Sequence, residues 1–132
     1  MRTPIVAGNW KMFKTPAEAA AFAKALVPAL APLDKVEQVV CPPFIDIPGV
    51  SEALKGTPIK VGAQNVHYAD GGAYTGEISP RMLKGLCQYV LVGQYERRIF
   101  FAVGRLGVRP LTQSLSRAVT PVPKVVYGCV SY

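Results

Sequence analysis

Acidic residues are missing from one end of this 132-residue chain, because residues 99–132 contain no aspartate and no glutamate. Residues 1–98 carry 11 Lys/Arg against 8 Asp/Glu, whereas residues 99–132 carry 4 Lys/Arg alone. The net charge of +7 therefore arises from absent carboxylates and not from a dense basic patch of the kind that binds nucleic acid. We expect no nucleic-acid partner.

The sequence also lacks the patterns of metal sites, secreted domains and membrane spans. Cys41, Cys87 and Cys129 stand at wide, unrelated spacings without a Cys-x-x-Cys pair, which predicts no metal site. Unpatterned thiols favour a reducing, cytoplasmic location. No apolar run approaches the roughly 18 residues of a membrane-spanning helix, and the polar N-terminal stretch does not resemble a signal peptide. We expect no membrane association.

Apolar runs alternate with helical patterns from the N-terminus to about residue 98. This alternation is typical of β-α units around a parallel sheet, and it predicts an α/β fold. The predicted strands are 5–8, 36–41, 59–63 and 89–92.

Helix signals separate these strands. Thr15, Pro16 and Glu18 combine a cap, a first-turn proline and a capping-box glutamate, so a helix begins there, and Pro28 ends or kinks it. Asp46 is expected to cap a short helix that runs to about Leu54. A further brief helix is expected after Ser79-Pro80.

Two strings contain the chemically informative residues, and each follows a predicted strand. The first runs from Ala7 to Met12, and the second from Gly93 to Arg98. A lysine at the end of an apolar strand is costly to desolvate unless it meets an anion. Lys11 is thus either a contact for an anionic substrate, positioned with Asn9, or a solvated loop residue.

Several separated segments resemble the triosephosphate isomerase family, in the order in which that family has them. They are Gly8-Asn9-Trp10-Lys11-Met12, Cys41-Pro42-Pro43-Phe44, Gly62-Ala63-Gln64-Asn65-Val66, the segment from Gly72 to Ser79, and Gly93-Gln94-Tyr95-Glu96-Arg97-Arg98. The resemblance runs from residue 4 to residue 98. It implies an incomplete TIM (β/α)8 barrel, with about four N-terminal β-α units in residues 1–98 and a divergent segment in residues 99–132.

The resemblance implies interconversion of dihydroxyacetone phosphate and glyceraldehyde 3-phosphate, a glycolytic step, without a cofactor. In this chemistry a glutamate removes a proton, a neutral histidine polarises the carbonyl and a lysine stabilises the developing charge. By match, Asn9 and Lys11 contact the triose phosphate, and Glu96 stands beside the electrophile. The family is homodimeric. Thr75 would reach toward the partner's site, and Glu77 and Arg98 would lie near the dimer contact.

Two departures from the family pattern predict an inactive chain. Gln94 occupies the electrophile position where the family has histidine, and Tyr95 replaces a serine. Loss of a placed general acid lowers rates on the order of 10²–10⁴-fold. The family's catalytic base, lid and main phosphate loops correspond to no part of this chain, and the single histidine, His67, is expected at the surface.

Three functions remain open. The first is a triosephosphate isomerase homologue that is truncated and inactive. The second is a non-catalytic interaction module whose Tyr74-Thr75 loop pairs with an intact subunit. The third, another phosphate-handling barrel enzyme, is disfavoured by the Gly8-Asn9-Trp10-Lys11 string. Because four strands cannot close an eight-stranded barrel, we also expect the isolated chain to aggregate or self-associate.

The segment 99–132 shows neither a helical stripe nor strict alternation. One hypothesis is a reading-frame shift near residue 98, since the expected acidic helix is missing. Residues 118–122 weakly resemble the family's next strand, as if the original frame returned. The competing hypothesis is a divergent paralogue with a shortened chain.

Overall fold

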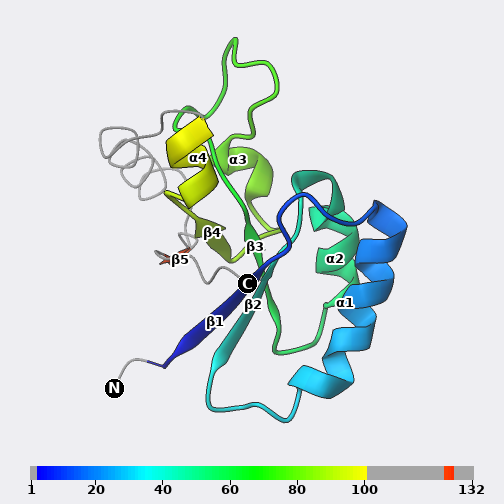
Figure 1. Ribbon diagram of the computed structural model, residues 1–132. Helices are drawn as coiled ribbons and strands as arrows, with labels where there is room; N and C mark the ends of the chain where they lie inside the picture. Colours follow the sequence, from blue (N-terminus) through cyan, green and yellow to red (C-terminus); the bar gives the residue numbers. More distant parts are fainter. Residues whose placement is uncertain (1–2, 101–123, 127–132) are drawn as a thin grey trace.

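A five-stranded parallel sheet forms the centre of the computed structural model, which describes residues 3–100 and 124–126 (Figure 1). Its order, β1-β2-β3-β4-β5, follows the sequence, and each strand pairs in parallel with the next. The strands are β1 (Ile5–Asn9), β2 (Glu37–Cys41), β3 (Lys60–Ala63), β4 (Tyr89–Leu91) and β5 (Lys124–Val126).

The first four strands confirm the predicted ones to within one residue at either end. β5 was not predicted. It pairs with β4 in the register Val90↔Val125, so part of the divergent segment continues the sheet. Residues 118–122 lie outside the described residues.

Helices connect the strands, as the alternating pattern predicts. They are α1 (Pro16–Leu30), the 3-10 turn η1 (Phe44–Asp46), α2 (Ile47–Ala53), α3 (Pro80–Leu83) and α4 (Tyr95–Phe100). α1 and α2 pack against each other on one side of the sheet (Figure 1). α4, which was not predicted, begins directly after Gln94.

The start of α1 confirms the predicted capping signals. The Glu18 carboxylate accepts hydrogen bonds of 2.8 Å from both the Thr15 backbone N–H and the Thr15 hydroxyl. These bonds stabilise the charged form and lower the pKa of Glu18. The helix runs through Pro28 and ends two residues later at Leu30.

The prediction that Asp46 caps α2 is right in position but wrong in contact. Asp46 directly precedes the helix, yet neither of its carboxylate oxygens has a hydrogen-bond partner among the described residues. An N-cap residue needs an extended backbone to bring its side chain back onto the first turn. Asp46 instead has helical angles (φ −92°, ψ −18°), because it closes the preceding 3-10 turn.

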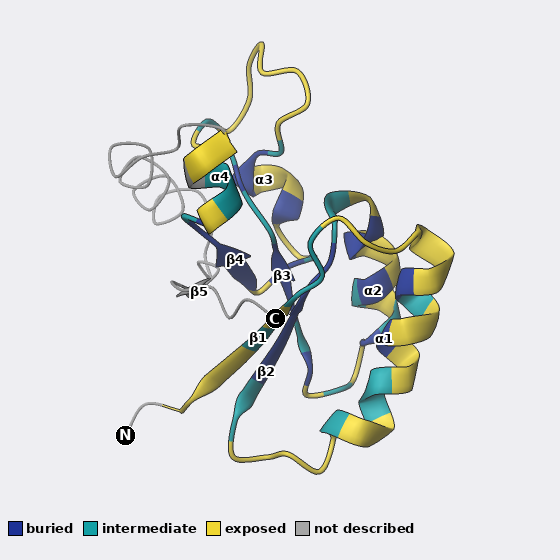
Figure 2. Cartoon of the chain, in the orientation of Figure 1, coloured by how far each residue is buried: buried dark blue, intermediate teal, exposed yellow. Residues whose placement is uncertain are grey.

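Alternation along the strands divides the buried residues between two faces of the sheet (Figure 2). One face packs against α1 and α2 and includes Val40, Val61, Ala63 and Val90. The other face carries a second cluster of Val39, Cys41, Tyr89 and Leu91. Burial on both faces is the environment of strands in an all-parallel sheet.

Cys41 and Cys87 are free thiols in this core. Burial raises the pKa of each to about 12, so both are protonated and chemically inert at neutral pH. Cys129 lies outside the described residues. Within residues 3–100 and 124–126, no helix has the length and apolar character needed to cross a membrane.

Candidate functional site

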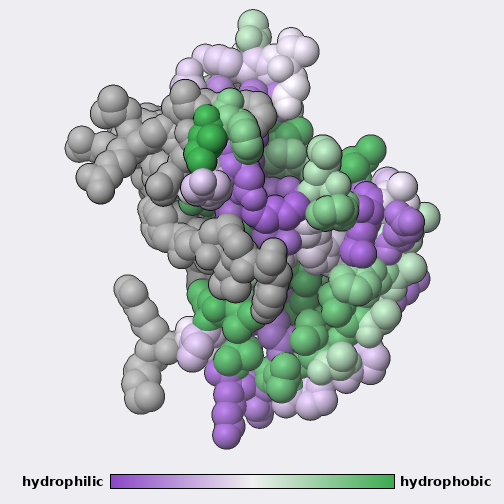
Figure 3. All heavy atoms as spheres, in the orientation of Figure 1, coloured by the Kyte–Doolittle hydropathy of each residue, from purple (hydrophilic) through white to green (hydrophobic). Residues whose placement is uncertain are grey.

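A cavity of about 660 Å³ lies at the carboxyl end of the sheet. In parallel α/β sheets this end collects the loops that bind ligands. Most of the cavity surface is apolar, with contributions from Met12, Phe44 and Phe100, and polar side chains enter it from the ends of β1, β3 and β4. Figure 3 shows hydrophilic surface between α4 and the loop that follows β1. The polar lining includes Asn9, Lys11, Gln64, Asn65, Gln94 and Glu96.

Lys11 is held in an unusual backbone conformation at this cavity. Its φ of 55° is left-handed, a region that costs a non-glycine residue roughly 1–3 kcal/mol. Lys14, which does not line the cavity, shares this conformation with a φ of 78°. The Asn9 Oδ1 accepts a 3.0 Å hydrogen bond from the Lys11 N–H, and so stabilises the turn.

Gln64 fixes the same turn from across the sheet. Its Nε2 donates to the Lys11 carbonyl at 2.8 Å and to the Cys41 carbonyl at 2.9 Å. A single amide thereby joins the loops after β1 and β2 from the end of β3. Sequence reasoning placed Gln64 in a family-like segment but did not list it as a site residue. Its position directly after a predicted strand was the available signal.

The Lys11 ammonium forms an ion pair with the Glu96 carboxylate, which comes from the first turn of α4. The hydrogen bond from Lys11 lowers the pKa of Glu96, and a backbone N–H adds to that effect. Glu96 is therefore a weak proton acceptor. The pair brings together residues that are 85 positions apart in the chain.

Gln94 lines the cavity and is 7% exposed. Its Oε1 atom has no hydrogen-bond partner among the described residues. A buried carboxamide can orient a ligand through its N–H and C=O groups, but it does not exchange a proton near neutral pH. The position predicted for an electrophile is thus inside the cavity and holds a group that only forms hydrogen bonds.

Thr75, Glu77 and His67 do not line this cavity. Thr75 and Glu77 are exposed in the loop between β3 and α3, which projects from the body (Figure 1). His67, expected at the surface, is half-buried there, with its ring centroid 4.3 Å from that of Tyr68 and 4.2 Å from that of Tyr74. The structure does not describe the Arg98 side chain.

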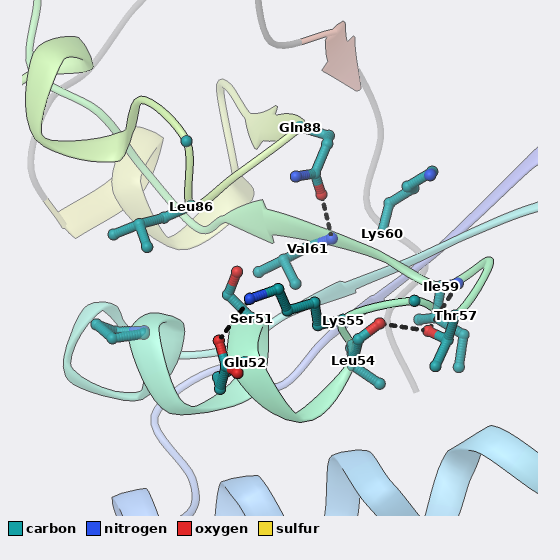
Figure 4. A pocket seen from close by; sticks show the side chains of 13 residues that line it. Ser51, Glu52, Leu54, Lys55, Thr57, Ile59, Lys60, Val61, Leu86 and Gln88 are labelled. Atoms are coloured by element: carbon teal, nitrogen blue, oxygen red, sulfur yellow. Dashed lines mark hydrogen bonds and ion pairs between the residues drawn. The ribbon is translucent and has the colours of Figure 1, made fainter.

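A second cavity, of about 410 Å³, lies between α2 and the start of β3 (Figure 4). Its two lysines do not converge on a common point. Lys55 pairs with Glu52 at 3.7 Å, and the Lys60 ammonium turns away from that of Lys55. In barrel folds the amino end of the strands serves stability and not catalysis. The cavity with Lys11 is therefore the candidate site.

A parallel sheet with outer helices, and a cavity with several polar and charged side chains at the carboxyl ends of its strands, defines part of a (β/α) barrel of the enzyme type. Comparison with known proteins makes this specific. The family model for triosephosphate isomerase matches residues 4–120. The chain belongs to the triosephosphate isomerase family, a family of isomerases.

Relatives and a solved structure agree with this assignment. The chain is 50% identical over 102 residues to triosephosphate isomerase of Carboxydothermus hydrogenoformans, covering 76% of this chain and 41% of that protein. It is 42% identical over 123 residues to the Dehalococcoides mccartyi protein, covering 92% and 49%. The crystal structure of triosephosphate isomerase from Bartonella henselae superposes with a TM-score of 0.86 at 31% identity, over 96% of this chain and 51% of that one. The chain thus spans about half the length of the curated relatives that it matches.

Proposed function

We propose that this chain binds triose phosphate at the Lys11 cavity and does not isomerise it. The observation that supports binding is the fixed Lys11 turn, since Asn9 and Gln64 hold the lysine at the cavity in a strained conformation. A cation that is positioned before the ligand arrives loses little conformational freedom on binding. Glu96 neutralises Lys11 in the ligand-free state, and an anionic ligand would compete with it.

The absence of turnover follows from the proton chemistry of isomerisation. A proton must leave the carbon beside the carbonyl while the carbonyl oxygen becomes negative. Gln94 can donate a hydrogen bond to that oxygen but cannot transfer a proton to it. Glu96, whose pKa is lowered by Lys11, is a poor substitute for a base.

Binding can be measured through Trp10, which is the only tryptophan of the chain and is next to Lys11. We expect dihydroxyacetone phosphate to change its fluorescence with saturation, and Lys11→Met to weaken binding about tenfold or more. Lys60→Met is the matched control, because Lys60 lies at the opposite end of the sheet. Equal affinity in the two variants would contradict the proposal.

The lack of turnover has a separate test. In a coupled isomerase assay the purified chain should not exceed the rate of buffer. A rate well above buffer, retained after further purification and lost in Lys11→Met, would show that the chain is an active isomerase.

A second candidate function is pairing with an intact subunit. It is supported by the projecting loop, in which Thr75 is exposed and Tyr74 is 43% exposed. We expect the chain to co-purify with full-length triosephosphate isomerase of Carboxydothermus hydrogenoformans, and Thr75→Glu to abolish this. Recovery of the subunit without the chain would count against pairing. The homodimer, the cytoplasmic location and the division into residues 1–98 and 99–132 stay predictions.

A further inference from the structure

The β1–α1 loop, residues 10–15, connects the first strand to the first helix and contains two strained residues (Figure 1). Lys11 and Lys14 both have left-handed backbone angles, with φ of 55° and 78°. A non-glycine residue adopts this region at a cost in free energy, so its surroundings must hold it there. Hydrogen bonds with Asn9 and Gln64 do this for Lys11. A contact of a different kind holds Lys14.

Two aromatic rings receive the side chain of Lys14. Its ammonium lies 4.0 Å from the ring centroid of Phe22 in α1 and 5.9 Å from that of Trp10. Both distances are within the range of a cation–π contact. The two rings pack edge to face, with their centroids 5.3 Å apart. The Glu18 carboxylate, one turn before Phe22, adds an attractive charge. Lys14 thereby ties the β1–α1 loop to the helix.

The two residues between the lysines provide no comparable anchor. Met12 is 94% exposed and Phe13 is 70% exposed, so the burial of their side chains contributes little. At the far end of the loop, the capping box of Thr15 and Glu18 fixes the start of α1. The path of the backbone from this fixed helix back to Lys11 therefore depends on the Lys14 contact.

We propose that Lys14 is a positioning residue, whose cation–π contact with Phe22 holds the Lys11 ammonium at the cavity for an anionic ligand. Lys14 does not line that cavity, so its effect on a ligand passes through Lys11. A cation that is already in place loses little conformational freedom when the ligand arrives. The inference rests on the proposed binding of triose phosphate at Lys11. The dependence of the Lys11 turn on Lys14 can nevertheless be measured without a ligand.

Amide hydrogen exchange of the full chain, followed by NMR, tests the turn. The reporter is the Lys11 N–H, which donates to the Asn9 Oδ1. Loss of a cation–π contact at an exposed site changes an equilibrium constant about two- to fivefold, so Lys14→Met should speed the exchange of this amide by that factor. The amides of β2 should exchange as in the wild type, because they report the opening of the core.

Two further variants serve as controls for Lys14→Met. Lys14→Arg keeps a cation that stacks on aromatic rings, so the exchange of the Lys11 amide should return to the wild-type rate. Lys24→Met removes another exposed lysine, on the same helix as Phe22, and should leave that rate unchanged.

Fluorescence titration with dihydroxyacetone phosphate tests the role in binding. Lys14→Met should raise the Kd about two- to fivefold, whereas Lys14→Arg and Lys24→Met should keep the wild-type value. Phe22→Leu removes the ring and retains an apolar side chain. On that background Lys14→Met should add little further loss, because both substitutions remove the same contact.

The two measurements separate failure of this inference from failure of the proposed function. An unchanged exchange rate of the Lys11 amide in Lys14→Met would overturn the inference, and so would faster exchange with an unchanged Kd. Absence of saturable binding in the wild type would instead contradict the proposed function, and the exchange rates would still decide whether Lys14 holds the Lys11 turn.

Discussion

Gly62→Ala offers a direct test of how tightly the face of the sheet opposite α1 and α2 is packed. A Cβ at this position would lie 2.7 Å from the Cys41 Sγ and 3.2 Å from both the Tyr89 Cβ and a Val39 Cγ. Contacts below 3.0 Å are essentially never made by a real Cβ. The three neighbours are all buried and lie on the strands either side of β3, so relief of the clash requires rotation of packed side chains or a shift of the strands.

The expected loss can be worked out from two opposing effects. Overpacking a tight core costs about 1–3 kcal/mol, and replacing glycine by alanine returns about 0.4–1 kcal/mol by restricting the unfolded chain. We expect a net loss of about 1–2 kcal/mol in the free energy of unfolding. At about 4 °C per kcal/mol for a chain of this size, the Tm falls by about 4–8 °C. Urea and thermal denaturation, followed by circular dichroism, measure both quantities.

Gly49→Ala is the control for this substitution. Gly49 lies in α2, and its added Cβ would meet nothing within 4 Å. Alanine is the better helix former, so we expect a gain of about 0.5–1 kcal/mol. Cys41→Ala removes the atom nearest the clash, and combined with Gly62→Ala it should destabilise less than the sum of the single changes. A Gly62→Ala protein as stable as Gly49→Ala would refute the reasoning.

Three further substitutions test other contacts. Burial, aided by the charge of Glu18, raises the pKa of Asp46. The ionised carboxylate therefore destabilises the fold as the pH rises above the pKa that Asp46 has in the unfolded chain. Asp46→Asn removes this ionisation, so in urea titrations between about pH 4 and about pH 7 the variant should be more stable than the wild type. Glu18→Ala should have the opposite effect, because the pKa of Glu18 is lowered in the folded chain. The Glu18 carboxylate stabilises the fold above the pKa that it has in the unfolded chain, so the variant should be less stable than the wild type at about pH 7 and approach its stability in acid. Gln64→Ala removes the donor to the Lys11 and Cys41 carbonyls, and we expect a loss of about 1–3 kcal/mol in urea denaturation together with weaker dihydroxyacetone phosphate binding.

Much of the fold was predictable because its signals are local. A few neighbouring residues are enough to encode a buried strand or a Thr-Pro-x-Glu helix start. The first four strands and α1 accordingly appear where expected. β5 has only three residues, and its pairing with β4 defines it more than its own composition. The Asp46 cap failed for a related reason, since the preceding 3-10 turn sets its backbone angles.

The site contains Lys11, whose position is set by hydrogen bonds to its backbone, and Gln94, whose side chain decides whether a proton can be transferred. The sequence predicted that Lys11 follows the first strand, and its geometry depends on Asn9 and Gln64 through N–H and carbonyl contacts that do not involve Gln94. Gln94 is buried at the same cavity, and among the described residues its Oε1 has no hydrogen-bond partner, so we expect that its exchange leaves the Lys11 turn in place. In the function proposed above, ligand binding and proton transfer therefore depend on different residues, and a chain that has lost the second can retain the first.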